Sequence, residues 1–281
     1  GSVRNQGIEL ALNFENTWRN FTWMSGLTYS MNKNKIESLA DNVINPITGQ
    51  LFSIPSLDMG GYADLRFILR EGGSMGDLYS RTDLRRDANG AIYMDESNNV
   101  YTQKIDNPDS YIKLGSVLPK GNLAWRNNFM WKNFHVGFMI SARLGGVVFS
   151  RTQAILDKFG VSEASADARD NGFVLINGND RVNPENWYTT VGSTAVPQYY
   201  TYSATNVRLQ EASIGYTIPR KWLANVCDIK VSLIGRNLWM IYNKAPFDPE
   251  AVASTDNFYQ GIDNFMMPSL RNVGFSLNFK F

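Results

Sequence analysis

The sequence is almost without the residues on which many enzymes and metal proteins depend. It has one cysteine, Cys227, and one histidine, His135, in 281 residues. A single cysteine excludes an internal disulfide and a cysteine-based zinc site, and His135 has no partner motif, so we expect it to be structural or solvated. Patterns of serine hydrolases, HExxH metalloproteases, P-loops and GxGxxG turns are absent too. We therefore expect no catalysis, no cofactor and no metal site, although paired carboxylates of the glycosidase kind cannot be judged from spacing along a chain.

Long apolar runs and an excess of charge of one sign are also missing. A membrane-spanning helix needs about 20 consecutive apolar residues, whereas the apolar stretches here are interrupted at alternate positions by Gly, Ser, Asn, Arg or Lys. Lys and Arg number 27 against 26 Asp and Glu, so the net charge is +1, and the cations are scattered. This balance predicts no nucleic-acid partner and no basic membrane-surface patch.

Aromatic residues are abundant and lie in segments that have two unlike faces. The chain has 7 Trp, 13 Tyr and 16 Phe, yet its mean hydropathy is only −0.27. Alternation of apolar and polar residues predicts strands with one apolar and one polar face. The apolar phase slips between Leu209 and Ile214, which predicts a β-bulge there. The alternating segments are 8–14, 21–31, 63–69, 122–131, 134–144, 199–217, 229–233 and 273–281.

Three features favour membrane strands over a soluble sandwich. The segments often exceed about 10 residues, as tilted membrane strands must. Aromatic residues cluster at strand ends, as in Trp18 with Phe21 and Trp131 with Phe134, where interface girdles belong. Short turns also alternate with long connections, the pattern of periplasmic turns and external loops. The expected short turns are 19–20, 71–74, 132–133 and 218–225, and the long connections are 34–59, 85–119, 149–198 and 243–267.

The sequence therefore predicts an all-β fold, an antiparallel transmembrane β-barrel with about nine strands in this chain and long external loops. An open sheet of nine strands would leave two unpaired edges in lipid, which is costly. Bacterial single-chain barrels close with an even number. We therefore expect residues 1–281 to be the C-terminal part of a longer barrel, without its N-terminal portion or a signal peptide.

Motifs spread over nearly the whole chain resemble those of the SusC/RagA group of TonB-dependent transporters. They are RNQGIEL at 4–10, GDLY at 76–79, IKLG at 112–115, NVRLQEASIGYTIP at 206–219, IGRNLW at 234–239, FDPE at 247–250 and the final strand from Met267 to Phe281. Ser80 and residues 244–246 depart from the family pattern. These departures affect the expected detail of the loops and not the resemblance to the family. Phe281 resembles the C-terminal signal that the barrel-assembly machinery recognises.

The resemblance implies a multi-pass barrel of about 22 strands with an N-terminal plug. It also implies a SusD-like surface lipoprotein as a lid, energy from TonB, and the outer membrane of a Gram-negative, Bacteroidetes-like bacterium as the lipid bilayer. The implied function is active import of a large nutrient, a glycan or an oligopeptide. Two alternatives stay open: a passive or adhesive barrel without a plug, and a soluble carbohydrate-binding β-domain.

Two loops supply candidate ligand contacts. Aromatic rings beside Asn, Asp and Glu suit sugar rings, since CH faces stack on the rings and hydroxyls meet polar groups. The same residues suit loop packing or lid contact equally. The candidates are Trp187, Tyr188, Tyr199 and Tyr200 in the first loop and Asp256, Asn257, Phe258 and Tyr259 in the second.

Two other loop segments have recognisable local patterns. Residues 150–159 are typical of a helix. The run that begins at Asp87 partly resembles a calcium loop, but Ala91 and Ile92 stand where ligands are needed. Asn89-Gly90 between short strand-like runs favours a hairpin turn instead.

Overall fold

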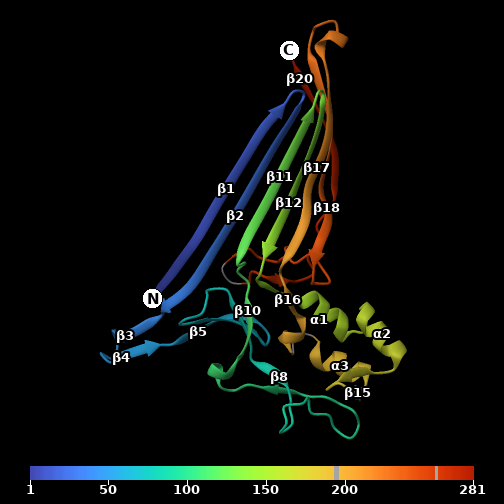
Figure 1. The fold of residues 1–281 in the computed structure, drawn as a ribbon. Helices are drawn as coiled ribbons and strands as arrows, with labels where there is room; N and C mark the ends of the chain where they lie inside the picture. Colours follow the sequence, from blue (N-terminus) through green and yellow to red (C-terminus); the bar gives the residue numbers. More distant parts are fainter. Residues whose placement is uncertain (193–195, 257–258) are drawn as a thin grey trace.

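Seven long strands form one antiparallel sheet, which we call the wall, in the order β1-β2-β11-β12-β17-β18-β20. The structure is a computed structural model that describes residues 1–192, 196–256 and 259–281. Short turns join the strands at one end, and long connections leave from the other (Figure 1). The strands are β1 (Ser2–Trp18), β2 (Phe21–Ser38), β11 (Gly121–Trp131), β12 (Phe134–Leu144), β17 (Asn206–Ile218), β18 (Asp228–Asn243) and β20 (Asn272–Lys280).

The register of the wall collects apolar side chains on one face. At the turn end, five ring-bearing residues are paired strand to strand in a single row, which we call the aromatic row: Trp18, Phe21, Trp131, Phe134 and Tyr216. Further along, large apolar side chains stay exposed, with Ile214 at 54% and Phe275 at 77%. A soluble protein rarely exposes a continuous apolar surface of this kind, so this face is suited to lipid.

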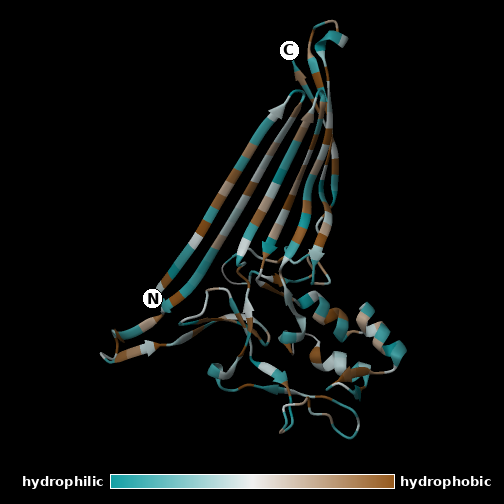
Figure 2. Ribbon diagram, in the orientation of Figure 1, coloured by the Kyte–Doolittle hydropathy of each residue, from teal (hydrophilic) through white to brown (hydrophobic). Residues whose placement is uncertain are grey.

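The opposite face of the wall is polar. It takes the alternate positions of each strand, so hydrophilic and hydrophobic residues alternate along the ribbons (Figure 2). Arg236 Nε lies 3.0 Å from Glu211 Oε2 across two strands. His135 lies on this face near the turns, with Nε2 2.9 Å from Thr217 Oγ1, which is a structural role of the expected kind. The polar face has the character of a wet lumen.

The long connections fold together at the other end of the wall into a unit that we call the loop domain. Its strands are β3 (Ala40–Ile44), β4 (Leu51–Ile54), β5 (Ser56–Tyr62), β6 (Leu65–Arg70), β7 (Asp77–Ser80), β8 (Thr82–Leu84), β9 (Thr102–Lys104), β10 (Ile112–Ser116), β13 (Val147–Ser150), β14 (Val174–Ile176), β15 (Asp180–Val182), β16 (Thr201–Ser203) and β19 (Ile262–Asp263). Its helices are α1 (Arg151–Lys158), α2 (Glu163–Asn171), α3 (Pro184–Val191) and the 3₁₀ turns η1 (Pro108–Ser110) and η2 (Pro197–Tyr200), while η3 (Arg220–Trp222) lies in the third short turn. Among the described residues, no helix combines the length and the apolar character needed to cross a membrane.

The loop domain has a hydrophobic core of its own. Leu65, Phe67 and Leu78 come from its four-stranded sheet β10-β7-β6-β5, and Phe149 comes from β13. Residues from α1, α3 and other segments of the loop domain also belong to this cluster. Buried apolar area of this extent stabilises a folded unit, so the long connections form a shaped surface rather than separate loops.

One strand expectation was wrong. Segment 63–69 was predicted as a wall strand, but β6 belongs to the loop domain, where Leu65, Phe67 and Ile68 are all buried. The expected turn at 71–74 therefore also lies in the loop domain. Alternation shows that one face of a strand is apolar, but it does not show whether lipid or a protein core covers that face. The described wall accordingly has seven strands rather than about nine.

Other local predictions are confirmed. The bulge falls at Gln210, because Met139 and Ile140 pair with Glu211 and Leu209. The helix expected at 150–159 is α1, and Ser150 Oγ caps it by accepting from Gln153 N at 3.0 Å. The Asn89-Gly90 hairpin forms as well, with Asp87 N donating to Ala91 O at 2.9 Å.

A pair of arginine substitutions on β2 tests the assignment of the two faces. Leu27→Arg places a charge in the middle of the apolar face, and we expect it to destabilise the full-length protein by about 2–4 kcal/mol. Thr28→Arg puts the same side chain on the polar face, where a cost below about 1 kcal/mol is expected. Urea unfolding of the protein folded into lipid vesicles measures both, and equal costs would contradict the assignment.

Candidate functional site

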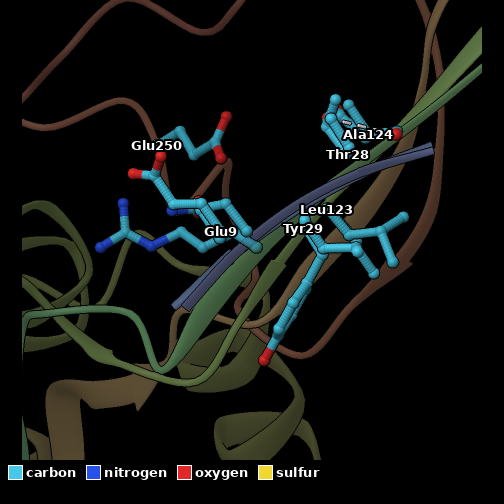
Figure 3. Close-up of a pocket in the computed structure, with 13 residues that line it drawn as sticks. Glu9, Thr28, Tyr29, Leu123, Ala124 and Glu250 are labelled. Carbon is cyan, nitrogen blue, oxygen red and sulfur yellow. Dashed lines mark hydrogen bonds between the residues drawn. The ribbon is translucent and has the colours of Figure 1, made fainter. Parts of the chain in front are cut away.

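A cavity lies where the polar face of the wall meets the loop domain. Its volume is about 500 Å³, and four wall strands and the connection after β18 line it. Figure 3 shows Thr28 and Ala124 on one side of the strands and Tyr29 and Leu123 on the other, as alternation requires. The lining residues are Glu9, Leu10, Ala11, Thr28, Tyr29, Ser30, Asn122, Leu123, Ala124, Ser141, Ala142, Arg143 and Glu250.

The cavity combines donors and acceptors of hydrogen bonds. Glu9 and Glu250 provide carboxylates, and Arg143 provides a guanidinium. The Nη2 of Arg143 donates to Val117 O at 2.8 Å, which fixes the side chain between wall and loop domain. Hydroxyl and amide side chains of Thr28, Ser30, Asn122 and Ser141 complete the polar lining. Such a set can hold the hydroxyls of a sugar or the amides of a peptide.

A buried ion pair fixes the connection that carries Glu250. Arg208 on β17 has a side chain that is only 6% exposed, and its Nη2 lies 2.8 Å from Asp248 Oδ1 and 3.1 Å from Glu250 Oε2. Its Nη1 lies 3.2 Å from Asp248 Oδ2, so the Asp248 contact is bidentate. The FDPE motif is therefore the anchor of this connection to the wall, and it sets Glu250 at the cavity.

The protonation of Asp248 is governed by this pair. Burial alone would raise the pKa of Asp248, but hydrogen bonds from Arg208, Ser269 and the Glu250 amide outweigh it and hold the pKa below its ordinary value. A carboxyl with a depressed pKa in the folded state contributes stability above its unfolded pKa and loses it as the pH falls. The anchor is therefore fully formed at neutral pH.

Two of the predicted ligand contacts lie inside the loop-domain core. Trp187 is 8% exposed and Tyr200 is 2% exposed, and both belong to the core cluster. Burial raises the pKa of Tyr200, which stays protonated at neutral pH. These residues have the packing role that the sequence left open as an alternative to ligand binding.

Two further candidates lie at the edge of this core. Tyr199 is partly exposed, and its ring meets that of Trp187 edge to face at 5.3 Å. Tyr188 is half-buried, and its hydroxyl donates to Ala164 O at 3.0 Å. Ligand contact by Tyr188 and Tyr199 stays a prediction.

The second group of candidates is more exposed. Asp256 is exposed, and Tyr259 is about half exposed, with its ring 6.1 Å from that of Phe67. Asn257 and Phe258 lie outside the described residues. Phe281 follows β20 and is exposed, and its role as an assembly signal stays a prediction.

The cavity residues escaped sequence reasoning. Glu9, Arg143 and Glu250 are far apart in the chain; strand pairing aligns Glu9 and Arg143, and the ion pair with Arg208 brings in Glu250. The resemblance offered a partial signal, because Glu9 lies in RNQGIEL and Glu250 in FDPE.

Comparisons with known proteins extend over the whole chain, although no family model matches it. The chain is 26% identical to TonB-dependent receptor P3 and to TonB-dependent receptor P26, both of Formosa agariphila, over its full length. It spans 29% of each of these relatives.

Solved structures share the fold. The RagAB peptide importer in its open-open and closed-closed states gives TM-scores of 0.69 and 0.62 at 15% and 18% identity. A further structure of the RagAB peptide transporter gives 0.63 at 15% identity. Each covers at least 99% of this chain, which in turn covers 29–30% of the solved chains.

The fold and the comparisons define the class of protein as part of the wall of an outer-membrane β-barrel. The comparisons then narrow the class: over its whole length the chain is similar to TonB-dependent receptors, and it shares its fold with part of the RagAB transporter. The relatives are named as receptors and the solved structures as an importer or transporter, which confirms the expectation that the chain is not an enzyme.

Substitution of Asp248 tests the anchor. Asp248→Asn leaves the buried Arg208 charge without its bidentate partner, and we expect a loss of about 3–5 kcal/mol. Limited proteolysis of the full-length protein at neutral pH should then cut the 244–271 connection. The wild-type connection should resist until the pH falls below about 4, where carboxyls begin to protonate.

The exposed pair of Arg4 and Glu37, 3.7 Å apart, provides the control for this test. We expect Glu37→Gln to cost less than about 1 kcal/mol, because exposed pairs contribute little. Protease resistance of Asp248→Asn equal to that of Glu37→Gln would contradict the anchoring role.

Proposed function

We propose that this chain forms the C-terminal barrel portion of an outer-membrane transporter that actively imports a large nutrient, a glycan or an oligopeptide. The transporter is the SusC-like half of a complex with a SusD-like surface lipoprotein, and TonB energises it through the N-terminal portion of the same protein. Its location is the outer membrane of a Gram-negative, Bacteroidetes-like bacterium. No covalent chemistry occurs.

The observation that carries the proposal is the division of the wall into an apolar and a polar face, with one folded domain at one end. Backbone groups at a sheet edge need partners in hydrocarbon. β1 and β20 are the two edge strands of the described wall. Further strands of a longer barrel would supply those partners, and the 29% coverage of the relatives supports the same view.

The loop end of the wall is the proposed place of ligand capture. The cavity there offers carboxylates, a guanidinium, hydroxyls and an amide, which suit polar ligands of either class. The loop domain adds Tyr188, Tyr199, Asp256 and Tyr259 as candidate contacts to ligand or lid. A large ligand would pass from this end along the polar face.

Different observations distinguish the proposed importer from a soluble carbohydrate-binding domain and from a passive or adhesive barrel. The continuous exposed apolar face argues against a soluble carbohydrate-binding domain. A passive or adhesive barrel would share the wall but would transport, if at all, without energy coupling. Dependence on TonB therefore separates the proposed importer from this rival.

Uptake by intact cells tests the proposal. Cells that carry the full-length transporter and its lipoprotein are supplied with labelled glycan and oligopeptide panels, with and without TonB. We expect uptake of one ligand class, lost on deletion of TonB because the plug then stays in place. Undiminished uptake without TonB would contradict active import.

A matched pair of substitutions on β1 tests the cavity. Glu9→Gln removes a cavity carboxylate, and we expect about tenfold weaker ligand binding, the size of one charged hydrogen bond. Glu15→Gln removes the same charge from the polar face near the turns, and binding should not change. Calorimetric titration of the purified complex with the imported ligand measures both, and equal effects would contradict a cavity site.

A further inference from the structure

Two of the three short turns have nearly the same sequence and the same geometry. One is Trp18-Arg19-Asn20-Phe21, and the other is Trp131-Lys132-Asn133-Phe134. The Trp and Phe rings stack across each hairpin, with centroids 6.0 Å apart at 24° in the first and 6.3 Å apart at 21° in the second. Each turn thus places one cation directly beyond a stacked aromatic pair.

The backbone at these cations is unusual. Arg19 and Lys132 both have φ of 54°, the left-handed region that favours Gly and Asn in two-residue hairpin turns. Asparagine is present in both turns but occupies the following position. A long basic side chain therefore stands twice where Gly or Asn would be less strained, which indicates a use for the cation itself.

The turns form one continuous rim. Lys132 N donates to Asn20 O at 2.9 Å, and Thr217 N donates to Asn133 O at 2.8 Å. The third turn adds Lys221 beside the exposed Trp222. Basic residues that are scattered in the sequence are thus brought to the same end of the wall.

The cations of the rim are available to an anion. Asp228 pairs with Arg220, with Oδ2 3.3 Å from Nη2. Over the ranges described, Arg19, Lys132 and Lys221 form no salt bridge with a carboxylate. Lys132 Nζ lies 5.2 Å from the centre of the Trp131 ring, so its side chain is held at the level of the aromatic row.

The aromatic row sets the depth of the rim in the membrane. Rows of Trp, Tyr and Phe lie where hydrocarbon meets headgroups. Arg19 and Lys132 come one residue beyond this row, at the level of lipid phosphates. Cations at this level attract anionic lipids.

We propose that Arg19, Lys132 and Lys221 form a binding site for the phosphate of anionic phospholipids, of the phosphatidylglycerol type, in the leaflet on the turn side. Stacked rings contact the upper acyl chains, and the cations pair with the headgroup. Bound lipid fixes the depth of the wall, independently of which nutrient the transporter carries.

Lipid binding by the full-length transporter in nanodiscs tests the proposal. Native mass spectrometry compares retained phosphatidylglycerol with neutral phosphatidylcholine. We expect Arg19→Gln, Lys132→Gln and Lys221→Gln together to lower the preference for phosphatidylglycerol more than tenfold, because each cation near the surface is worth about fivefold. The same number of charges removed from the loop domain, by Lys104→Gln, Lys158→Gln and Arg181→Gln, should leave the preference unchanged.

A second variant separates lipid binding from turn stability. Arg19→Gly with Lys132→Gly relieves the left-handed strain, so thermal stability in neutral detergent should be kept or raised while the lipid preference falls. An unchanged preference in both rim variants, or an equal fall in the loop-domain control, would overturn the proposal.

Discussion

The wall depends on the hydrogen bonding of its backbone. In hydrocarbon every N–H and C=O must find a partner, and for a strand those partners lie on two neighbouring strands. Once the seven wall strands are paired in register, that pairing determines which face of the sheet each side chain occupies. Apolar positions fall into rows on one side and polar positions on the other. That pairing therefore produces the aromatic row and the polar lining. It also places the long connections, and with them the loop domain, at one end of the wall.

A few polar contacts fix the loop domain to the wall next to the cavity where a ligand would bind. The ion pair of Arg208 with Asp248 and Glu250 joins the β18–β20 connection to the wall. Arg143 joins the wall to the segment between β10 and β11, through Val117 O. The loop domain then needs only its own apolar core to hold its shape. A cavity at this junction is therefore built on rigid elements, which suits recognition of a polar ligand.

Sequence patterns succeeded where the information is local. The clean alternation of β20, the helix at α1 and the Asn89-Gly90 hairpin were all predicted from neighbouring residues. β6 was misassigned because a strand on a protein core and a strand facing lipid alternate alike. Trp187 and Tyr200 could not be told from ligand contacts, since an aromatic residue in a loop suits both roles. The meeting of Glu9, Arg143 and Glu250 depends on strand register and on the distant ion pair with Arg208, which no local pattern contains.

Spin-label accessibility along β2 in the full-length transporter gives the most direct test of the two-faced wall. Labels placed singly from residue 21 to residue 31 in a lipid bilayer are exposed to oxygen, which dissolves in lipid, and to a water-soluble relaxant. We expect the odd-numbered positions to respond to oxygen and the even-numbered positions not to, with a period of two residues. Uniform accessibility, or the opposite phase, would contradict a wall that turns the face of Phe21, Leu27 and Tyr29 to lipid.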